Sequence, residues 1–164
     1  MNAEEYGKKK RNKAVPAVYL VLITMGEILM LLRQNTGYQD GNWDLPSGHI
    51  EPGELPMQAI AREAKEEVGL NFLPRHLTLV YTSYRPQHDV TGDRIDLFFR
   101  AGRVLGRVVN GEPHKCAQVR WFAVEHIPEN TVPHVKHALQ EISRGSCYSE
   151  LGLEWLRKEG VYKL

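Results

Sequence analysis

Glutamates stand at positions 63, 66 and 67 of the chain, close enough to act as a group. On a helix, which turns by about 100° per residue, Glu63, Glu66 and Glu67 project from one side within an arc of about 100°. Their charges then repel one another by roughly a few tenths of a kcal/mol per pair, and a bound cation would reverse the sign of that energy. The spacing therefore indicates a cation site, with a solvated acidic helix face as the alternative.

A helix is expected around these glutamates because apolar residues recur there at helical spacing. They are Met57, Ile60, Ala61, Ala64 and Val68. Pro56 suits the first turn of a helix, and Gly69 suits the position just after its end. We therefore expect one amphipathic helix over residues 55–68, with the glutamates beside its apolar stripe.

The loop before this helix, residues 47–54, carries further residues of interest. Gly48 and Gly53 permit sharp turns of the backbone, and Glu54 stands at the helix entrance. Arg62 lies four residues before Glu66, where a guanidinium can restrain a carboxylate. The loop and the helix are thus expected to form one unit.

Together these residues match the pattern Gly-x5-Glu-x7-Arg-Glu-U-x-Glu-Glu-x-Gly-U, in which U is apolar. The matching residues are Gly48, Glu54, Arg62, Glu63, Glu66, Glu67 and Gly69, with Ala64 and Leu70 in the apolar places. The pattern is the Nudix box, and the chain resembles the MutT-like Nudix hydrolase family over most of residues 14–143. The resemblance implies an α+β fold, a Nudix-type α/β/α sandwich with a mixed sheet between helices.

The resemblance also implies an enzymatic activity. Family members hydrolyse a nucleoside diphosphate linked to another group, using Mg²⁺ or Mn²⁺, and such hard cations prefer oxygen ligands. The family's metal ligands correspond to Glu63, Glu66, Glu67 and the carbonyl of Ser47. Glu66 and Glu67 are therefore catalytic candidates, and the resemblance gives Arg62 and Glu54 the task of positioning the ligands.

The general base is sought in a later loop. MutT-type members use an additional glutamate from a loop before a late strand, and the spacing from Gly106 to Glu112 suits such a loop. We expect Glu112 to be this base, with an exposed turn residue as the alternative. In that case the base lies among the box glutamates, with Glu66 the first candidate.

Several residues are candidates for substrate contacts. Arg33 resembles the basic residue that family members place on substrate phosphates, although an ordinary charge at a strand end is the alternative. Asn130 and His126 lie in a loop where MutT-like proteins contact the base, but an asparagine there is equally a turn former. Tyr38, Tyr84 and Phe98 have rings that stack on purines, and core or rim positions are the more expected outcome for them.

Three functions are compatible with this set. The leading one is hydrolysis of a nucleoside triphosphate to a nucleoside monophosphate and pyrophosphate. An ADP-ribose or other dinucleotide pyrophosphatase is the second, because Pro86, sixteen residues beyond Leu70, resembles a proline of ADP-ribose enzymes. A catalytically silent nucleotide-binding module is the third, and the intact box glutamates weigh against it.

The rest of the chain predicts further strands and helices around the box. A hairpin is expected from residues 17–24 and 28–33, and residues 43–46 are too short for more than a strand fragment. Further strands are expected at 77–84, 95–104 and 119–122, and helices at 133–143 and 150–158. Residues 145–152 show no recognisable chemistry and are expected to dock the tail. One Nudix hydrolase domain over residues 14–164 follows.

Composition narrows the choice of partners. The chain has 164 residues, with 21 basic and 20 acidic side chains and a net charge of +1, so it lacks the excess of positive charge that a nucleic-acid scaffold needs. We expect a small-molecule nucleotide partner, no nucleic acid and no membrane, and a monomer or homodimer. His134 and His137 are three residues apart, but no carboxylate or thiol accompanies them at ligand spacing, which argues against a metal site there.

The N-terminus and the cysteines bear on location. Residues 8–11 are basic and precede an apolar run, a pattern similar to a signal peptide. Glu4 and Glu5 oppose that interpretation, and so does the lack of a small-residue cleavage site, so we expect residues 1–13 to form a flexible arm. Cys116 and Cys147 are far apart and fit no CxxC pattern, which suits a reducing compartment and makes the cytoplasm the expected location.

Overall fold

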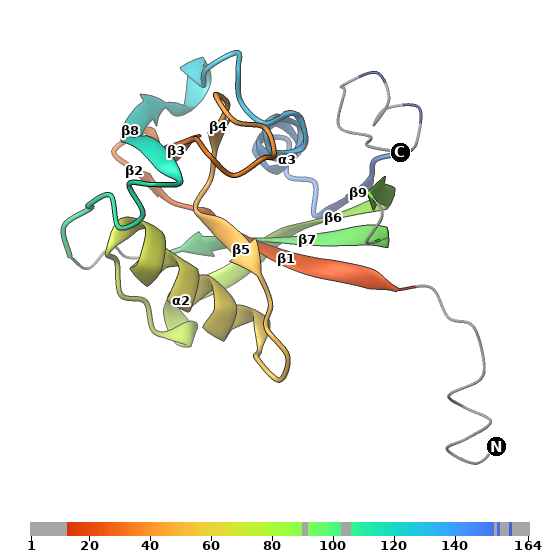
Figure 1. The fold of residues 1–164 in the computed structure, drawn as a ribbon, viewed down its shortest axis with the longest axis horizontal. Coiled ribbons are helices and arrows are strands. Elements are labelled where there is room, and N and C mark those ends of the chain that lie inside the picture. The colour runs from red at the N-terminus through yellow and green to blue at the C-terminus, as the bar shows by residue number, and fades with distance from the viewer. Residues whose placement is uncertain (1–12, 90–91, 103–105, 153, 155–157, 159–164) are drawn as a thin grey trace.

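The computed structural model describes residues 13–89, 92–102, 106–152, 154 and 158 (Figure 1). Its strands are β1 (Ala14–Val21), β2 (Ile23–Thr24), β3 (Glu27–Arg33), β4 (Trp43–Asp44), β5 (Ser47–His49), β6 (Leu77–Asp89), β7 (Gly92–Ala101), β8 (Cys116–Ala123) and β9 (Tyr148–Glu150). The helices are α2 (Pro56–Val68) and α3 (Pro133–Ser143), with short 3₁₀ turns η1 (Pro74–His76) and η2 (Val124–His126). The expected N-terminal arm lies almost wholly outside the described residues.

The strands form two sheets. The larger sheet has the order β5-β1-β7-β6-β9, with β1 parallel to β7 and β9 parallel to β6, while the other neighbours are antiparallel. In the smaller sheet β2 and β4 pair with different ends of β3 along one edge of that strand. Strand β8 pairs with β3 along its other edge. The predicted mixed sheet is therefore confirmed.

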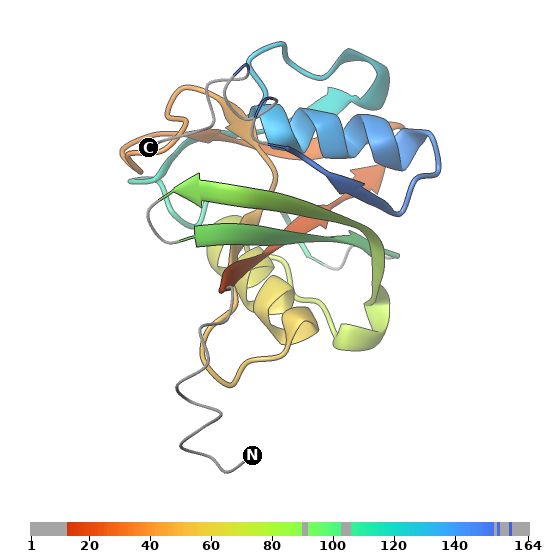
Figure 2. The ribbon, with the colours of Figure 1, turned by 90° about the vertical axis from the view of Figure 1, so that its right-hand side faces the viewer.

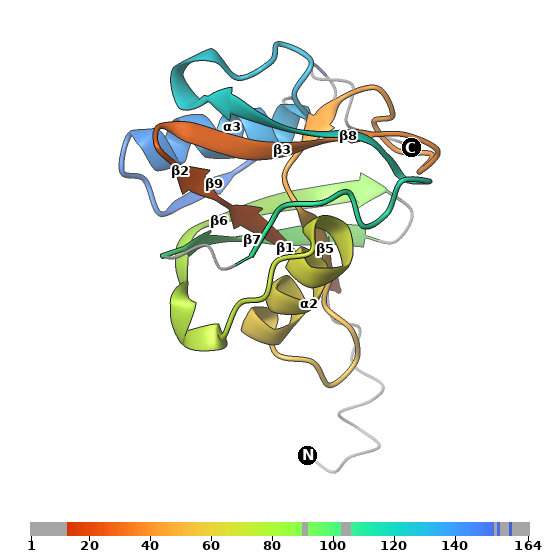
Figure 3. The same ribbon diagram turned by 90° about the vertical axis from the view of Figure 1, so that its left-hand side faces the viewer.

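The two helices cover opposite faces of β1 because its side chains alternate. Val18 and Leu20 belong to the apolar cluster that contains the buried face of α2. Ala17, Tyr19 and Val21 belong to a second cluster, which includes Val135 and Ala138 of α3. Figures 2 and 3 show α2 and α3 on opposite sides of the larger sheet, as expected for a layered α/β/α arrangement.

Helix α2 forms where the apolar spacing predicts it. Pro56 occupies the first turn, and Gly69 ends the helix in the left-handed conformation with φ of 71°. Its buried residues are Ala59, Ile60, Ala64 and Val68. Met57, which the stripe includes, is 38% exposed, whereas Ala59, which the stripe leaves out, is buried.

Two predicted elements differ from the structure. The expected strand 17–24 is two strands, because the chain passes from one sheet to the other at the buried Leu22. The hairpin is formed by β2 and β3 alone, around a turn in which Met25 and Gly26 have positive φ.

The predicted helix 150–158 is wrong at its start, because Glu150 ends strand β9 beside β6. Residues 153 and 155–157 lie outside the described part of the chain, and Glu154 and Lys158 are helical. Within the described residues, no helix is both long and apolar enough to cross a membrane.

Candidate active site

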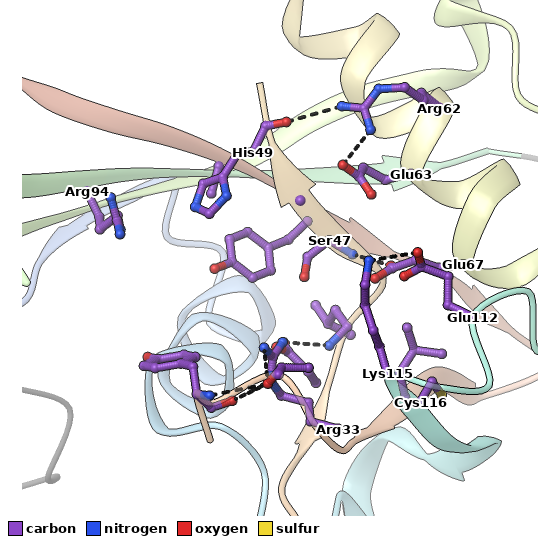
Figure 4. Close-up of a pocket in the computed structure, with 18 of the residues that line it drawn as sticks. Arg33, Ser47, His49, Arg62, Glu63, Glu67, Arg94, Glu112, Lys115 and Cys116 are labelled. Atoms are coloured by element: carbon purple, nitrogen blue, oxygen red, sulfur yellow. Dashed lines mark hydrogen bonds and ion pairs between the residues drawn. The ribbon is translucent and has the colours of Figure 1, made fainter. Parts of the chain in front are cut away.

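A cavity of about 620 Å³ opens beside the acidic side of α2 (Figure 4). Its wall includes residues of β1, α2, β3, β5, β6, β7 and the loop before β8. The cavity gathers the following residues predicted from the sequence: Arg33, Ser47, Arg62, Glu63, Glu67 and Glu112. Residues as far apart as 33 and 112 therefore share one space.

Arg62 ties the helix to the loop before it. Its Nε and Nη2 atoms donate to the two carboxylate oxygens of Glu54 at 2.9 and 3.0 Å. Its Nη1 atom donates to Glu63 Oε1 at 2.6 Å and to Glu66 Oε2 at 3.3 Å, and Nη2 also donates to the carbonyl of His49 at 3.1 Å. These contacts support the positioning role expected for Arg62 and Glu54.

Glu63 lies directly against strand β5 at Gly48. A Cβ atom on Gly48 would lie 1.9 Å from Glu63 Oε1, far inside van der Waals contact. Burial raises the pKa of Glu63, and the adjacent Arg62 opposes that rise. The carboxylate is therefore packed against backbone and partly removed from water.

Glu67 lies one turn further along α2 and deeper in the site. Its Oε2 atom accepts a hydrogen bond from the backbone amide of Ser47 at 2.8 Å. Burial raises its pKa well above the usual value, and the charges of Glu63, Asp44 and Glu112 add to the rise. The site thus holds several carboxylates whose mutual repulsion is built into the fold.

Glu112 reaches the cavity because its loop docks on the C-terminal end of α2. The amides of Val109 and Gly111 donate to the carbonyls of Val68 and Glu67 at 3.1 and 2.9 Å. A Cβ atom on Gly111 would lie 1.9 Å from the carbonyl oxygen of Glu66, so the approach depends on glycine. The loop that the sequence proposes as the source of a base is therefore joined to the box helix.

These residues form a donor set that suits a hard divalent cation. Glu63, Glu67 and Glu112 supply carboxylate oxygens to one cavity. The charge of Glu112 disfavours the ionised forms of Glu63 and Glu67, and the charge of Glu63 disfavours that of Glu67. A cation would relieve that repulsion. In the described residues no three His, Cys, Asp or Glu side chains are already converged as ligands, and Arg62 holds one oxygen of Glu63. The residues therefore fit the ion in chemistry and placement, and binding it requires side chains to turn.

Arg33 forms the opposite wall together with the loop that follows β3. Its Nη1 atom donates to Asp44 Oδ2 at 2.8 Å, its Nε to the carbonyl of Tyr38 at 2.9 Å, and its Nη2 to Thr36 Oγ1 at 3.1 Å. The guanidinium is thus held in a fixed place facing the cavity, as a phosphate-binding group needs to be.

Some predicted site residues lie elsewhere. Glu54, Glu66 and Asn130 are outside the set of described residues that line the cavity. The side chain of Glu66 is 51% exposed, and Glu54 acts through Arg62. The Asn130 side chain donates to the carbonyl of Gly41 at 2.8 Å, so its position favours the turn-forming alternative over a base contact.

The candidate stacking residues also have structural roles. Phe98 is fully buried and stacks on Tyr19, with ring centroids 4.6 Å apart. The hydroxyl of Tyr84 donates to Asp93, whereas Tyr38 lines the cavity. His134 is buried in α3 with its Nε2 atom 3.0 Å from the Tyr19 hydroxyl, a hydrogen bond rather than a metal contact.

The cavity also contains ionisable residues that sequence reasoning missed, among them Asp44, His49, Arg85, Arg94 and Lys115. Arg85 in β6 donates to both carboxylate oxygens of Asp96 in β7, at 2.6 and 2.9 Å. In the sequence Asp96 is a charged position within a predicted strand and Arg85 directly follows one, and only the pairing of β6 with β7 shows that they meet. Lys115 follows Glu112 by three residues, but nothing in the sequence shows that its side chain turns back.

Comparison with known proteins gives the family. The NUDIX domain family matches residues 13–142. The chain belongs to the Nudix family. A 32% identical relative over 131 residues is an ADP-ribose pyrophosphatase from Methanocaldococcus jannaschii, matched over 79% of this chain and 75% of that protein. A putative 8-oxo-dGTP diphosphatase from Bacillus subtilis is 29% identical over 130 residues, 79% of this chain and 80% of that protein.

Other relatives of this Nudix protein have names that refer to RNA. An NAD-capped RNA hydrolase from Stutzerimonas stutzeri is 30% identical over 109 residues, 66% of this chain and 37% of that protein. Among these relatives the shared activity is cleavage of a pyrophosphate bond, so the protein is a Nudix pyrophosphohydrolase. Nudix hydrolases act on nucleotide substrates and generally need a divalent metal ion.

Solved structures show the same fold. A MutT Nudix hydrolase from Burkholderia pseudomallei has a TM-score of 0.70 at 22% identity, covering 79% of this chain and 98% of that chain. A MutT protein from Methanosarcina mazei Go1 has a TM-score of 0.69 at 23% identity, covering 83% and 97%. The fold expected from the Nudix box is therefore confirmed.

Proposed function

We propose that this Nudix enzyme hydrolyses a nucleoside triphosphate to a nucleoside monophosphate and pyrophosphate, with Mg²⁺, or Mn²⁺ in its place. The ion would be held by Glu63, Glu67 and the carbonyl of Ser47, with Glu66 turning from its contact with Arg62 to join them. The observation that carries the proposal is the meeting of Glu63, Glu67 and Glu112 in one cavity that Arg33 closes on the other side.

Each residue has a role in the proposed reaction. When bound, the metal neutralises charge on the phosphates and makes water more acidic. Glu112 takes the proton of the attacking water as the new oxygen–phosphorus bond forms, and the leaving phosphate keeps the electron pair of the broken bond. Arg33 binds a phosphate oxygen, and Arg62 with Glu54 keeps Glu63 in place. If Glu112 does not accept the proton, Glu66 is the next candidate.

The choice of substrate follows two of the relatives. The Bacillus subtilis relative, named as acting on a nucleoside triphosphate, favours the first choice. The Methanocaldococcus jannaschii relative favours ADP-ribose as the second candidate. Pro86 adds nothing to that candidate, because it lies within β6 and outside the described residues that line the cavity.

The net charge and the two cysteines bear on the partners and location of the protein. A small nucleotide is the proposed partner in preference to RNA, because the net charge is only +1. Cys116 and Cys147 are both free thiols, which supports the cytoplasm as the proposed location. We retain a monomer or homodimer as the proposed assembly.

A substrate screen with and without chelator tests the proposed function. Phosphate release is measured for nucleoside triphosphates, ADP-ribose, NADH and dinucleoside polyphosphates. We expect hydrolysis of triphosphates that stops in chelator and returns with Mg²⁺ or Mn²⁺. A preference for ADP-ribose would replace the first candidate by the second, and nucleotide binding without turnover would indicate the silent module. Full activity in metal-free buffer would refute the metal role.

A further inference from the structure

Lys115 places a positive charge at the catalytic end of the cavity. It is the residue before β8, and its Nζ atom donates to Glu112 Oε1 at 2.8 Å. Figure 4 shows its ammonium group beside Glu112 and Glu67, across the cavity from Arg94. No role is yet assigned to this side chain.

The backbone of Lys115 is fixed from two sides. Its amide donates to the carbonyl of Glu112 at 2.9 Å, and its carbonyl accepts a hydrogen bond from the amide of Gln34 at 2.8 Å. The side chains of Gln34 and Asn35 donate to the carbonyls of Pro113 and His114 at 2.7 and 3.1 Å. The loop after β3 and the loop before β8 are thereby clasped together, and the lysine starts from a defined position.

The ion pair with Glu112 contributes too little to the stability of the fold to explain why a lysine stands at position 115. The Lys115 side chain is 52% exposed and that of Glu112 is 24% exposed, and pairs this accessible contribute little to folding. The hydrogen bond that Lys115 donates to Glu112 raises the pKa of Lys115, and the charges of Glu67 and Glu63 raise it further. The ammonium is therefore charged, and it is attracted by the carboxylates of the site.

Lys115 has fewer side-chain partners than Arg62 and Arg33, the two arginines with an assigned role in the site. Arg62 is engaged by Glu54, Glu63, Glu66 and the His49 carbonyl, whereas Arg33 is engaged by Asp44, Thr36 and Tyr38. An ammonium has three donor protons, and in the described part of the chain Glu112 is the side chain bonded to this one. Donors remain for a ligand.

We propose that Lys115 is a catalytic residue whose ammonium exchanges Glu112 for a non-bridging oxygen of the substrate's pyrophosphate group. The ion pair seen here holds both side chains in place until the substrate arrives. The exchange leaves Glu112 free to accept a proton from water. It also places the positive ammonium beside the phosphate that gains negative charge as its bond breaks. This inference rests on the proposed function for the assignment of Glu112 as a base, but phosphate binding by Lys115 is testable without turnover.

The test measures binding of imidodiphosphate, a pyrophosphate mimic that is not hydrolysed, by calorimetry in the presence of Mg²⁺. Lys115→Met should weaken binding by about 10-fold or more, the scale of a lost hydrogen bond to a charged group. Lys115→Arg should restore most of the affinity, because it keeps the charge. Lys136→Met is the matched control, since Lys136 lies on α3 and outside the described residues of the cavity wall.

The same substitution in a Glu112→Gln protein distinguishes a direct contact of Lys115 with phosphate from an effect of Lys115 on Glu112. If Lys115 binds phosphate itself, Lys115→Met should weaken binding in the Glu112→Gln protein as well. Unchanged affinity in that background, or equal affinity of wild type and Lys115→Met, would overturn the proposal. Nucleotide hydrolysis is assayed in parallel. Binding that depends on Lys115 in a protein that hydrolyses no nucleotide would leave the inference standing and refute the proposed function instead.

Discussion

Asp44 is buried, with 3% of its surface exposed, and its carboxylate lies under the wall formed by Arg33. Burial raises the pKa of Asp44, and the positive charge of Arg33 opposes that rise. Removal of the guanidinium should therefore raise the pKa further. The same ion pair that places Arg33 for a phosphate also limits the cost of a buried charge.

Arg33→Met should destabilise the protein in a pH-dependent way. In the folded variant the pKa of Asp44 lies above its value in the unfolded chain, which is about 3.9. At pH values between these two pKa values the folded state keeps the proton that the unfolded state has lost. Stability is therefore lost as the pH rises through the folded value, and it is recovered as the pH falls below it. We expect a loss of about 1–3 kcal/mol near pH 8 that shrinks toward pH 5, measured by urea unfolding.

Arg75→Met is the control for that experiment, because Arg75 is exposed on η1. It should show no such dependence on pH. A constant loss from Arg33→Met at both pH values would mean that packing, and not the charge of Asp44, explains the effect.

At the scale of single residues, the sequence predicts best those site residues that belong to one local pattern. Glu63 and Glu67 share a helix, so their spacing alone places them together. Arg85 and Asp96 meet only through the register of β6 with β7, in which Ser83 pairs with Asp96 and Arg85 with Arg94. No periodicity within a single segment contains that information.

At the scale of elements, the close approach of the Glu112 loop to α2 decides the geometry of the site. Gly111 donates its amide to the Glu67 carbonyl and has no room for a side chain beside Glu66. The backbone there does not have the positive φ that favours glycine, so contact rather than strain explains the residue. The sequence does not predict this docking, because the loop lacks a periodic pattern.

Gly111→Ala should displace the Glu112 loop and reduce catalysis. The added Cβ must move backbone, so the proposed base shifts by a distance that matters at the site, and kcat should fall by about 10-fold or more. Gly102→Ala is the matched control, since its Cβ would meet the nearest atom at an ordinary 3.7 Å. Steady-state kinetics of both variants check the expectation, and equal kcat values would show that the loop position is unimportant.

At the scale of the whole molecule, the layered fold follows from alternation along β1, whose two faces meet α2 and α3. The sequence indicates this architecture through the Nudix box and the strand patterns. It does not indicate that residues 17–24 contribute to both sheets, because the β-branched and apolar residue types continue across Leu22 without a break. Strand β9 is missed for a different reason, since three residues carry too little pattern to predict.

Metal binding should appear as stability of the entire domain, because an ion that binds only the folded state stabilises it. At a concentration of about 100 times its Kd the gain is about 2.7 kcal/mol, or roughly 5–10 °C in Tm for a domain of this size. Glu67→Gln should lose most of this gain, since it removes a proposed ligand. In chelator the same variant should be at least as stable as wild type, because burial disfavours the charged form of Glu67.

Glu54→Gln is the matched comparison and should keep most of the metal-dependent rise, because Glu54 contacts Arg62. Thermal unfolding of the three proteins with chelator, Mg²⁺ and Mn²⁺ decides the matter: an equal rise in Glu67→Gln and wild type would remove Glu67 from the metal site.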